Sequence, residues 1–334
     1  MTEILKVEDL QIRFIGGKKD FSVVNGISFA LNRGETLGII GESGSGKSIS
    51  CMGILGLLAR DKWRVYGDIR FGENPLPYND NRAMRPYRGR HLALIIQNPL
   101  SAFNQMIPIA AHFYETLNVP NVPPQNMEQV RHQAREILAR MRIRDPDAVL
   151  DSYAFQLSGG MLQRIMIALA LVMKPDILIA DEPTTALDLT VQHEIITILQ
   201  EMQEKQGTAI LLISHDLGVI AHLASTIAVI YAGEFVEKGK AEALLECPAH
   251  PYTQGLFASR PKFSKERLPI MEGQPPRLFS ERRGCAFYPR CKSREDSCMT
   301  SRPSAVSAFS GGKEHETWCS RTAPSSVGHI GDGQ

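Results

Sequence analysis

The sequence lacks a hydrophobic run long enough to cross a membrane. Its longest apolar stretch, IMIALALVM at 165–173, falls well short of the about 18 residues that suggest a membrane-spanning helix. The first ten residues, MTEILKVEDL, carry three acidic side chains and no apolar core, which is not the pattern of a secretory signal. We therefore expect a soluble, cytosolic chain, and another chain must supply any membrane span that it works with.

The sequence also lacks an excess of charge of either sign. Its 37 basic and 36 acidic residues leave a formal net charge of +1. This balance gives no global field that would attract nucleic acid or an anionic membrane, so we expect no nucleic-acid partner. The 334 residues suggest about two domains. No internal repeat is visible, which indicates a single copy of each unit.

What the sequence does contain is strands that alternate with helices. Two apolar runs, DILIADEP and TAILLISHD, are typical of buried strands, and an amphipathic helix separates them. This alternation favours a parallel α/β sheet, which a mostly helical insert interrupts. The pattern predicts strands at 4–14, 27–40 (two strands), 67–71, 91–97, 176–183 and 208–216, and helices at 47–58, 127–141, 189–206 and directly after 157–160.

Residues 41–48 read GESGSGKS between a predicted strand and a predicted helix. Gly41, Gly44 and Gly46 would let backbone N–H groups curl around a β-phosphate. Lys47 would reach the β- and γ-phosphates, and the hydroxyl of Ser48 would bind Mg²⁺. The start of the helix adds positive potential. A plain glycine-rich turn is the alternative, and the Lys-Ser pair in this context argues against it.

Two adjacent carboxylates, Asp181 and Glu182, end the apolar run ILIADEP. Asp181 can hold Mg²⁺ through water, and Glu182 is then placed to orient or deprotonate an attacking water. A glutamate with the ordinary pKa of about 4.3 is a weak base, so its role can be mainly positional. The alternative is an ordinary acidic strand end.

The segment LSGGM at 157–161 opens another predicted helix. Ser158, Gly159 and Gly160 place a hydroxyl and uncovered backbone N–H groups at the helix start, which makes a second anion site. One chain needs only one such site for ATP. We therefore expect a dimer in which this loop closes the nucleotide of the partner chain. Taken alone, the tripeptide SGG is equally well explained as an ordinary helix start.

These segments come in the order found in the ATP-binding-cassette (ABC) ATPases. GESGSGKS, Gln97, LSGGMLQR, ILIADEP, ALD and His215 resemble that family over about residues 4–240. The resemblance implies an active ATPase with the P-loop NTPase fold: a RecA-like core, an N-terminal antiparallel β subdomain and a helical subdomain at about 98–168. It implies a nucleotide-binding domain at 1–245 and a small cysteine-containing extension at 246–334.

The resemblance also assigns roles residue by residue. It implies that Phe14 stacks on adenine, that Gln97 touches Mg²⁺ and water, and that His215 contacts the γ-phosphate. Asp188 falls at the dimer seam. The implied catalytic residues are Glu182, His215 and Gln97, and the implied Mg²⁺ ligands are Ser48, Gln97 and Asp181. The residues expected to contact ATP are Phe14, Gly41, Ser43, Gly44, Gly46, Lys47, Ser48, Ile49, Gln97, Ser158, Gly159, Gly160, Met161, Asp181 and Asp188.

Five further segments resemble one subfamily, the oligopeptide, dipeptide and nickel importers. They read IIQNPLSAFN, YAGEFVEKG, CPAHPYTQGL, EGQPP and GCAFYPRC. The resemblance implies the energy-coupling subunit of an importer of peptides or related small solutes, at the cytoplasmic face of the inner membrane. The implied partners are two permease chains, a second cassette, expected to be a paralogue, and an extracytoplasmic solute-binding protein. Two departures, Gln105 for proline and Met161 for glutamine, leave the catalytic set intact.

Four of the six cysteines lie in the last 50 residues with the spacing C-x5-C-x6-C-x20-C. Zinc sites usually contain tight C-x2–4-C pairs, whereas four thiolates suit a [4Fe–4S] cluster. The spacing alone leaves cluster and zinc about equal, and the subfamily resemblance favours the cluster. The predicted ligands are Cys285, Cys291, Cys298 and Cys319.

Two other classes of protein fit the sequence less well than an importer subunit. The first is a soluble ABC ATPase that acts on DNA or ribosomes. The insert before LSGG is too short for the coiled coil of the DNA-repair type, and the translation type usually has two cassettes in one chain. The second is a redox enzyme built around the cysteines, for which no second cofactor motif is visible. The transported solute, the identity of the second cassette and a structural or regulatory role for the cluster stay open.

Overall fold

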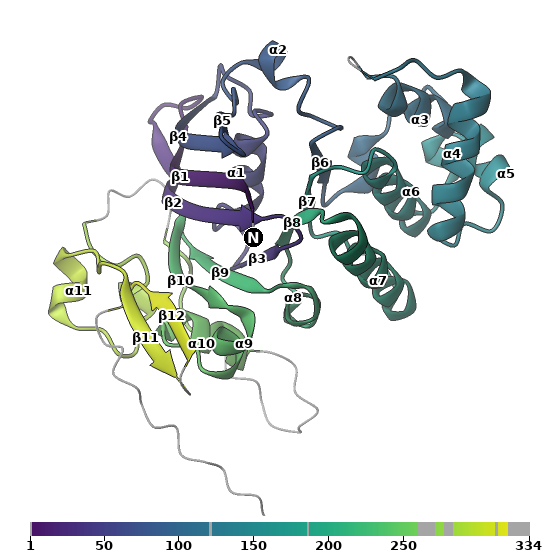
Figure 1. Cartoon of the computed structure of the whole chain (residues 1–334). Coiled ribbons are helices and arrows are strands. Elements are labelled where there is room, and N and C mark those ends of the chain that lie inside the picture. Colours follow the sequence, from purple (N-terminus) through teal and green to yellow (C-terminus); the bar gives the residue numbers. More distant parts are fainter. Residues whose placement is uncertain are drawn as a thin grey trace, which may run out of the picture.

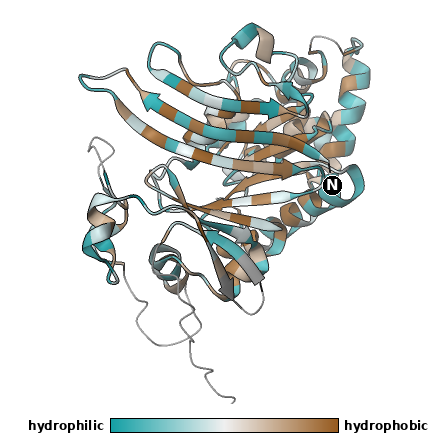
Figure 2. Ribbon diagram, turned by 60° about the vertical axis from the view of Figure 1, so that its left-hand side comes forward, coloured by the Kyte–Doolittle hydropathy of each residue, from teal (hydrophilic) through white to brown (hydrophobic). Residues whose placement is uncertain are grey.

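The computed structural model describes residues 2–119, 122–185, 187–259, 271–276, 283–310 and 313–319. These residues form two sheets, with helices around them (Figure 1). The first sheet is antiparallel, and Figure 2 shows hydrophilic and hydrophobic residues in alternation along its strands. This pattern is typical of a sheet with one buried face. Its strand order is β2-β1-β4-β5: β2 (Phe21–Asn32), β1 (Glu3–Phe14), β4 (Trp63–Phe71) and β5 (Asn74–Pro75).

The second sheet holds the core of the chain. Strands β3, β7 and β8 are buried at every residue, as expected of parallel strands covered on both faces. They pair in parallel, which confirms the predicted α/β class. The strand order is β11-β12-β10-β9-β3-β8-β7-β6: β11 (Val306–Ser310), β12 (Lys313–Thr317), β10 (Glu234–Lys240), β9 (Thr226–Tyr231), β3 (Thr36–Ile40), β8 (Ala209–Ile213), β7 (Ile177–Asp181) and β6 (Leu92–Ile95).

Between β6 and β7, the elements that the structure describes are all helical. Helix α4 packs against α3, α5 and α6 (Figure 1). Its apolar face, formed by Val130, Ala134, Ile137 and Met141, is buried. These elements are η1 (Pro99–Ala102), α3 (Ile109–Leu117), α4 (Met127–Arg140), α5 (Pro146–Asp151), η2 (Ala154–Gln156) and α6 (Gly159–Val172).

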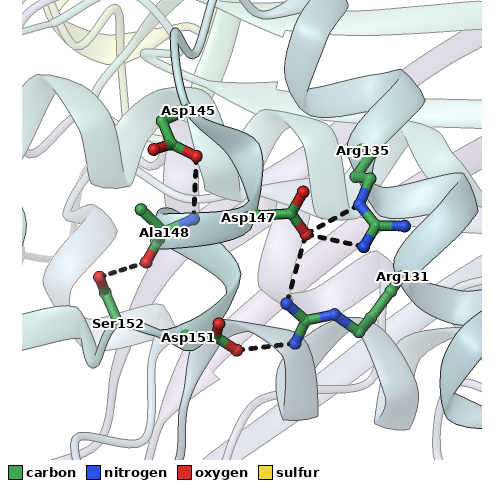
Figure 3. A network of polar contacts seen from close by, with 7 residues as sticks. All are labelled: Arg131, Arg135, Asp145, Asp147, Ala148, Asp151 and Ser152. Atoms are coloured by element: carbon green, nitrogen blue, oxygen red, sulfur yellow. Dashed lines mark hydrogen bonds and ion pairs between the residues drawn. The ribbon is translucent and has the colours of Figure 1, made fainter.

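Ion pairs tie α5 to α4 (Figure 3). Arg131 contacts Asp151 at 2.7 Å and Asp147 at 3.4 Å. Arg135 contacts Asp147 at 2.8 Å. Exposed pairs of this kind contribute about 0–1 kcal/mol each. They connect the two helices through side chains that are exposed or half-buried.

The remaining helices flank the sheets, and three sequence expectations need correction here. Strand β4, predicted at 67–71, begins at Trp63, four residues earlier. Helix α1 ends at Ile54, four residues before its predicted end, because the chain turns at Gly56 with a φ of 60°. Strand β2 begins at Phe21, six residues earlier than predicted. The predicted helix 189–206 is confirmed in full. The remaining bounds are α1 (Lys47–Ile54), α2 (Asn81–Met84), α7 (Leu189–Gln206), α8 (Leu217–Leu223), α9 (Ala241–Glu246), α10 (Pro251–Ala258), η3 (Tyr288–Arg290) and α11 (Asp296–Thr300).

The C-terminal residues extend the second sheet. Strand β12 pairs with β10, so that Thr317 lies opposite Glu237, and both strands can be followed in Figure 1. Glu237 is fully buried. The backbone N–H groups of Ala249 and His250 donate to its carboxylate at 2.6 and 3.0 Å, and Nε2 of His315 lies 2.9 Å away. These partners offset the cost of burying a charge.

His250 makes the stability of this region depend on pH. The side chain is buried, and its Nδ1 accepts a hydrogen bond from the backbone N–H of Tyr252 at 3.0 Å. Burial lowers the pKa of His250 from 6.5 to about 4. Below pH 6.5 the unfolded chain therefore binds a proton that the folded chain does not. The contribution of His250 to stability is complete above pH 6.5 and is lost as the pH falls towards 4.

We predict that the substitution His250→Asn, which keeps a hydrogen-bond acceptor, reduces this dependence on pH. Between pH 7 and pH 5 the free energy of unfolding should fall by about 2 kcal/mol more in the unsubstituted chain than in the variant. Urea unfolding at both pH values measures the difference. Equal losses in the two proteins would show that His250 is not the titrating group.

Candidate functional site

The loop between β3 and α1 has the backbone geometry that its glycines predict. Gly46 precedes α1 with a φ of 106°, in the left-handed region that favours glycine. A Cβ atom on Gly41 would collide with the backbone carbonyl of Ile230. These two glycines therefore allow the loop to turn tightly and the helix to begin at Lys47.

Lys47 lies inside the loop rather than in solvent. Its Nζ donates hydrogen bonds to the carbonyl oxygens of Gly41 and Glu42 at 2.8 and 2.9 Å. Burial lowers its pKa, although the carboxylates of Glu182, Asp181 and Glu42 act in the opposite direction. A cation held by two carbonyls at the start of a helix is well placed to receive phosphate oxygens.

Asp181 ends strand β7 beneath this loop. It is buried, and it accepts a hydrogen bond from the hydroxyl of Ser48, the second residue of α1. Burial raises the pKa of Asp181, and the bond from Ser48 acts against that rise. A carboxylate and a hydroxyl in contact are an oxygen donor set of the kind that Mg²⁺ prefers, so the residues present fit this ion.

Glu182 brings together three side chains from different parts of the chain. Its Oε2 accepts hydrogen bonds from Nε2 of Gln97 and Oγ1 of Thr185, both at 3.0 Å. Nδ1 of His215 lies 3.2 Å from the same oxygen. Glu182 has a φ of 52°, and such backbone strain in a non-glycine residue is typical of functional sites. Thr185 was not among the residues predicted from the sequence, and its position three residues after Glu182 is the signal that points to it.

These groups face a cavity of about 710 Å³, which falls in the usual size range of ligand pockets. Phe14 lies in its wall against Phe21 and Trp63, with ring centroids 5.2 and 4.9 Å away. Strand register aligns the three rings, because Phe14 pairs with both residues. Phe21 and Trp63 were not predicted from the sequence as residues of this cavity. The predicted residues that line the cavity are Phe14, Gly41, Ser43, Gly44, Gly46, Lys47, Ser48, Ile49, Gln97, Glu182 and His215.

The other predicted ATP contacts do not line this cavity. Asp181 is buried beside Ser48, and the rest lie at the starts of α6 and α7. Ser158 caps α6, and its side chain accepts a hydrogen bond from the backbone N–H of Met161 at 3.3 Å. Ser158 and Gly159 are exposed. Asp188 is also exposed and caps α7 by accepting a hydrogen bond from Val191 at 3.0 Å. A single chain therefore leaves these groups facing solvent.

Comparison with known proteins identifies the family. Residues 24–185 match the family described as ABC transporter. Residues 236–298 match the family described as oligopeptide/dipeptide transporter, C-terminal region. The chain belongs to the ABC transporter ATP-binding proteins. It is an ABC-type ATPase, as the order of its motifs predicts.

Several named relatives resemble nearly the whole chain. The dipeptide transport ATP-binding protein of Escherichia coli (strain K12) is 38% identical over 93% of this chain and 95% of its own length. The protein of the same name from Bacillus subtilis (strain 168) is 40% identical over 89% of each chain. The oligopeptide transport ATP-binding protein of Salmonella typhimurium is 36% identical over 93% of this chain and 92% of its own.

Solved structures show the same fold. An ATP-binding cassette in a dimeric, post-hydrolysis state bound to ADP and Pi has a TM-score of 0.65, at 23% identity over 71% of this ABC ATPase and 99% of that chain. A subunit of an ABC transporter complex from Clostridium perfringens has a TM-score of 0.58, at 26% identity over 72% of this chain and 90% of that one.

The predicted [4Fe–4S] cluster is wrong, and so is its zinc alternative. Cys285, Cys291, Cys298 and Cys319 do line one cavity, but its volume is about 20 Å³, which is room for about one water molecule. Within the described residues, no group of three or more His, Cys, Asp or Glu side chains could hold a metal ion. The relatives are named as ATP-binding proteins without mention of a metal. The subfamily resemblance favoured the cluster, and neither that resemblance nor the cysteine spacing could reveal how little room the four thiols leave between them.

We predict that Lys47→Ala weakens ATP binding at least tenfold, because the loop loses the cation that meets the phosphates. This corresponds to about 1.4 kcal/mol or more. Equilibrium titration with a fluorescent ATP analogue measures the change. Lys205→Ala, on the exposed side of α7, is the matched control and should bind as the unsubstituted chain does. Unchanged affinity in the Lys47 variant would contradict the assignment of this loop.

Proposed function

We propose that this ABC ATPase hydrolyses ATP in the cavity beside Lys47 to drive the import of peptides or related small solutes. The proposal rests on the side chains of Gln97, Thr185 and His215, which all contact the carboxylate of Glu182. This cluster lies next to the loop at 41–48, which we call the phosphate loop. The names of the relatives, which are dipeptide and oligopeptide transport ATP-binding proteins, support the class of solute.

The geometry supports distinct roles in binding. Backbone N–H groups of the glycine-rich loop at 41–48 receive the phosphates, and Lys47 exchanges its two carbonyl partners for phosphate oxygens. Phe14, with Phe21 and Trp63 behind it, offers the ring on which adenine stacks. Ser48, Asp181 and Gln97 are the residues that would hold Mg²⁺, which supplies charge neutralisation at the phosphates when bound.

Glu182 is the residue that we assign to the attacking water. Its carboxylate is already fixed by Gln97, Thr185 and His215, so it can accept a hydrogen bond from the water without reorganising. His215 is exposed enough to turn towards the γ-phosphate. A glutamate in this arrangement orients the water and takes its proton as the bond from the water oxygen to the γ-phosphorus forms and the bond to the β-phosphate oxygen breaks, releasing ADP.

The exposed starts of α6 and α7 support a dimeric mechanism. Ser158 and Gly159 are exposed at the start of α6, followed by the half-buried Gly160 and Met161, and the exposed Asp188 caps α7. We propose that these groups cover the nucleotide bound to a second cassette, and that the second cassette is a paralogue of this chain. Binding of ATP then closes the pair, and hydrolysis with phosphate release reopens it.

The proposed partners follow from this cycle. In the described part of the chain no helix has the length and apolar character needed to cross a bilayer. We propose that two permease chains supply the spans, that a separate solute-binding protein delivers the solute, and that the chain works at the cytoplasmic face of the membrane. Residues 1–245 would form the nucleotide-binding domain, with the helical subdomain at about 98–168, and 246–334 its extension.

We predict that Glu182→Gln lowers ATP turnover by about 10²- to 10⁴-fold, the range expected for loss of a general base. ATP binding should persist, because the phosphate loop is intact, and an ATP-bound dimer should accumulate. Release of phosphate and size-exclusion chromatography with ATP measure the two effects. Glu201→Gln, on an exposed face of α7, is the control. Full turnover in the Glu182 variant would remove this residue from the mechanism.

Transport coupling has its own test. The tagged chain is isolated from its native cells in a detergent that preserves membrane complexes, and its partners are identified by mass spectrometry. We expect two multi-span permeases and a second cassette. Recovery of soluble partners alone under these conditions would contradict a transport role while leaving the ATPase assignment intact.

A further inference from the structure

The phosphate loop is held from outside by the C-terminal extension. Arg290, in the short helix η3, contacts both carboxylate oxygens of Glu42, the second residue of the loop. The distances are 2.8 Å from Nη1 to Oε2 and 3.0 Å from Nη2 to Oε1. The pair joins residues 248 positions apart in the sequence. Two parallel hydrogen bonds from a guanidinium are strong and directional.

The guanidinium of Arg290 is fixed from its other sides as well. Its Nε donates to the backbone carbonyl of Glu272 at 3.1 Å, and Nη1 also donates to the hydroxyl of Tyr231 at 3.3 Å. The rings of Tyr231 and Phe287 lie 5.8 and 5.9 Å from it, which is within cation–π range. The side chain is only 5% exposed. This arrangement differs from an adventitious surface ion pair, which contributes little.

A second group from the C-terminal side holds the backbone of Glu42. The hydroxyl of Tyr252, on α10, accepts a hydrogen bond from the N–H of Glu42 at 2.8 Å. Tyr252 is fully buried, and burial raises its pKa, so that the hydroxyl stays neutral at physiological pH. Glu42 is therefore held by its side chain and by its backbone at once.

Glu42 in turn holds the residues that meet the nucleotide. Its carbonyl accepts hydrogen bonds from Nζ of Lys47 at 2.9 Å and from the backbone N–H of Ser45 at 3.2 Å. Its carboxylate also places a negative charge in a loop that receives a triphosphate. Without Arg290, that charge would repel the phosphates, and a half-buried carboxylate would lack its partner.

We propose that Arg290 is a positioning residue for ATP binding. It neutralises Glu42 and fixes the phosphate loop in the form that accepts phosphates, so docking of the C-terminal extension sets the affinity of the chain for ATP. This inference rests on the proposed binding of ATP beside Lys47. The hydrogen bonds of Arg290 go to Glu42, Tyr231 and Glu272 rather than to Asp181 or Glu182, so its effect falls on binding rather than on the chemical step.

The test is a double-mutant cycle on the full chain. The variants are Arg290→Met, Glu42→Gln and the two together, and the probe is a fluorescent ATP analogue. We expect R290M to raise the Kd about tenfold in the presence of Glu42, and less than twofold when Glu42 is already glutamine. R290M alone leaves the carboxylate of Glu42 unpaired next to the phosphates. In the double variant, position 42 carries no charge, so no unpaired charge remains there. At saturating ATP, kcat should stay within about twofold of its starting value in R290M.

Two further variants sharpen the result. R290K keeps the charge without the two-pronged contact, and we expect it to raise the Kd less than R290M does. Arg294→Met is the matched control, because Arg294 is exposed in the same segment and stacks near Tyr288. Its Kd should equal that of the unsubstituted chain. Thermal unfolding without nucleotide shows whether each variant is folded.

The outcomes separate the possibilities. An unchanged Kd in folded R290M overturns the inference, and so does an equal rise in Kd with and without Glu42, which would mean that Arg290 only anchors the extension. If R290M does not fold, R290K in both backgrounds decides by the same criterion. If the unsubstituted chain does not bind the probe, the proposed ATP site fails instead.

Discussion

The site depends on the parallel pairing of three buried strands. In the register of the second sheet, Ile39 of β3 and Asp181 of β7 both lie opposite Ile213 of β8. The three strands therefore end at the same edge, where ligands of parallel α/β sheets usually bind. The phosphate loop follows β3, Glu182 follows β7, and His215 follows β8. If the pairing of β8 with β7 or with β3 shifted by one residue, Glu182 would move away from His215, or Lys47 would move away from Asp181.

The phosphate loop is also a junction between the sheet and the C-terminal residues. Glu42 connects Lys47 on one side with Tyr252 and Arg290 on the other. The extension is not a loose appendage, because β12 pairs with β10 and continues the central sheet. We infer that a change in how the extension packs reaches the phosphate loop through Glu42.

The sequence predicts those features whose physical cause is local. A loop that binds phosphate needs its glycines, its lysine and a helix start within eight residues, so the segment GESGSGKS predicts a phosphate-binding loop by itself. Strands β7 and β8 can be predicted from the sequence in the same way, because strands buried on both faces are apolar throughout. Contacts that depend on register or tertiary packing leave no such pattern. Nothing in the sequence pairs Arg290 with Glu42, or places Trp63 opposite Phe14. The [4Fe–4S] cluster was favoured by the subfamily resemblance, because the cysteine spacing alone left cluster and zinc about equal, and the arrangement of the thiols in space does not support it.

The central claim is that ATP hydrolysis by this chain drives solute import, and uptake by the reconstituted complex tests it most directly. The complex isolated through the tagged chain is placed in proteoliposomes with its solute-binding protein, and uptake of labelled peptide mixtures is followed with ATP on the side of the cassettes. We expect uptake that requires ATP and that disappears when Glu182 is replaced by glutamine. Uptake that proceeds equally without ATP, or equally with the variant, would contradict this account.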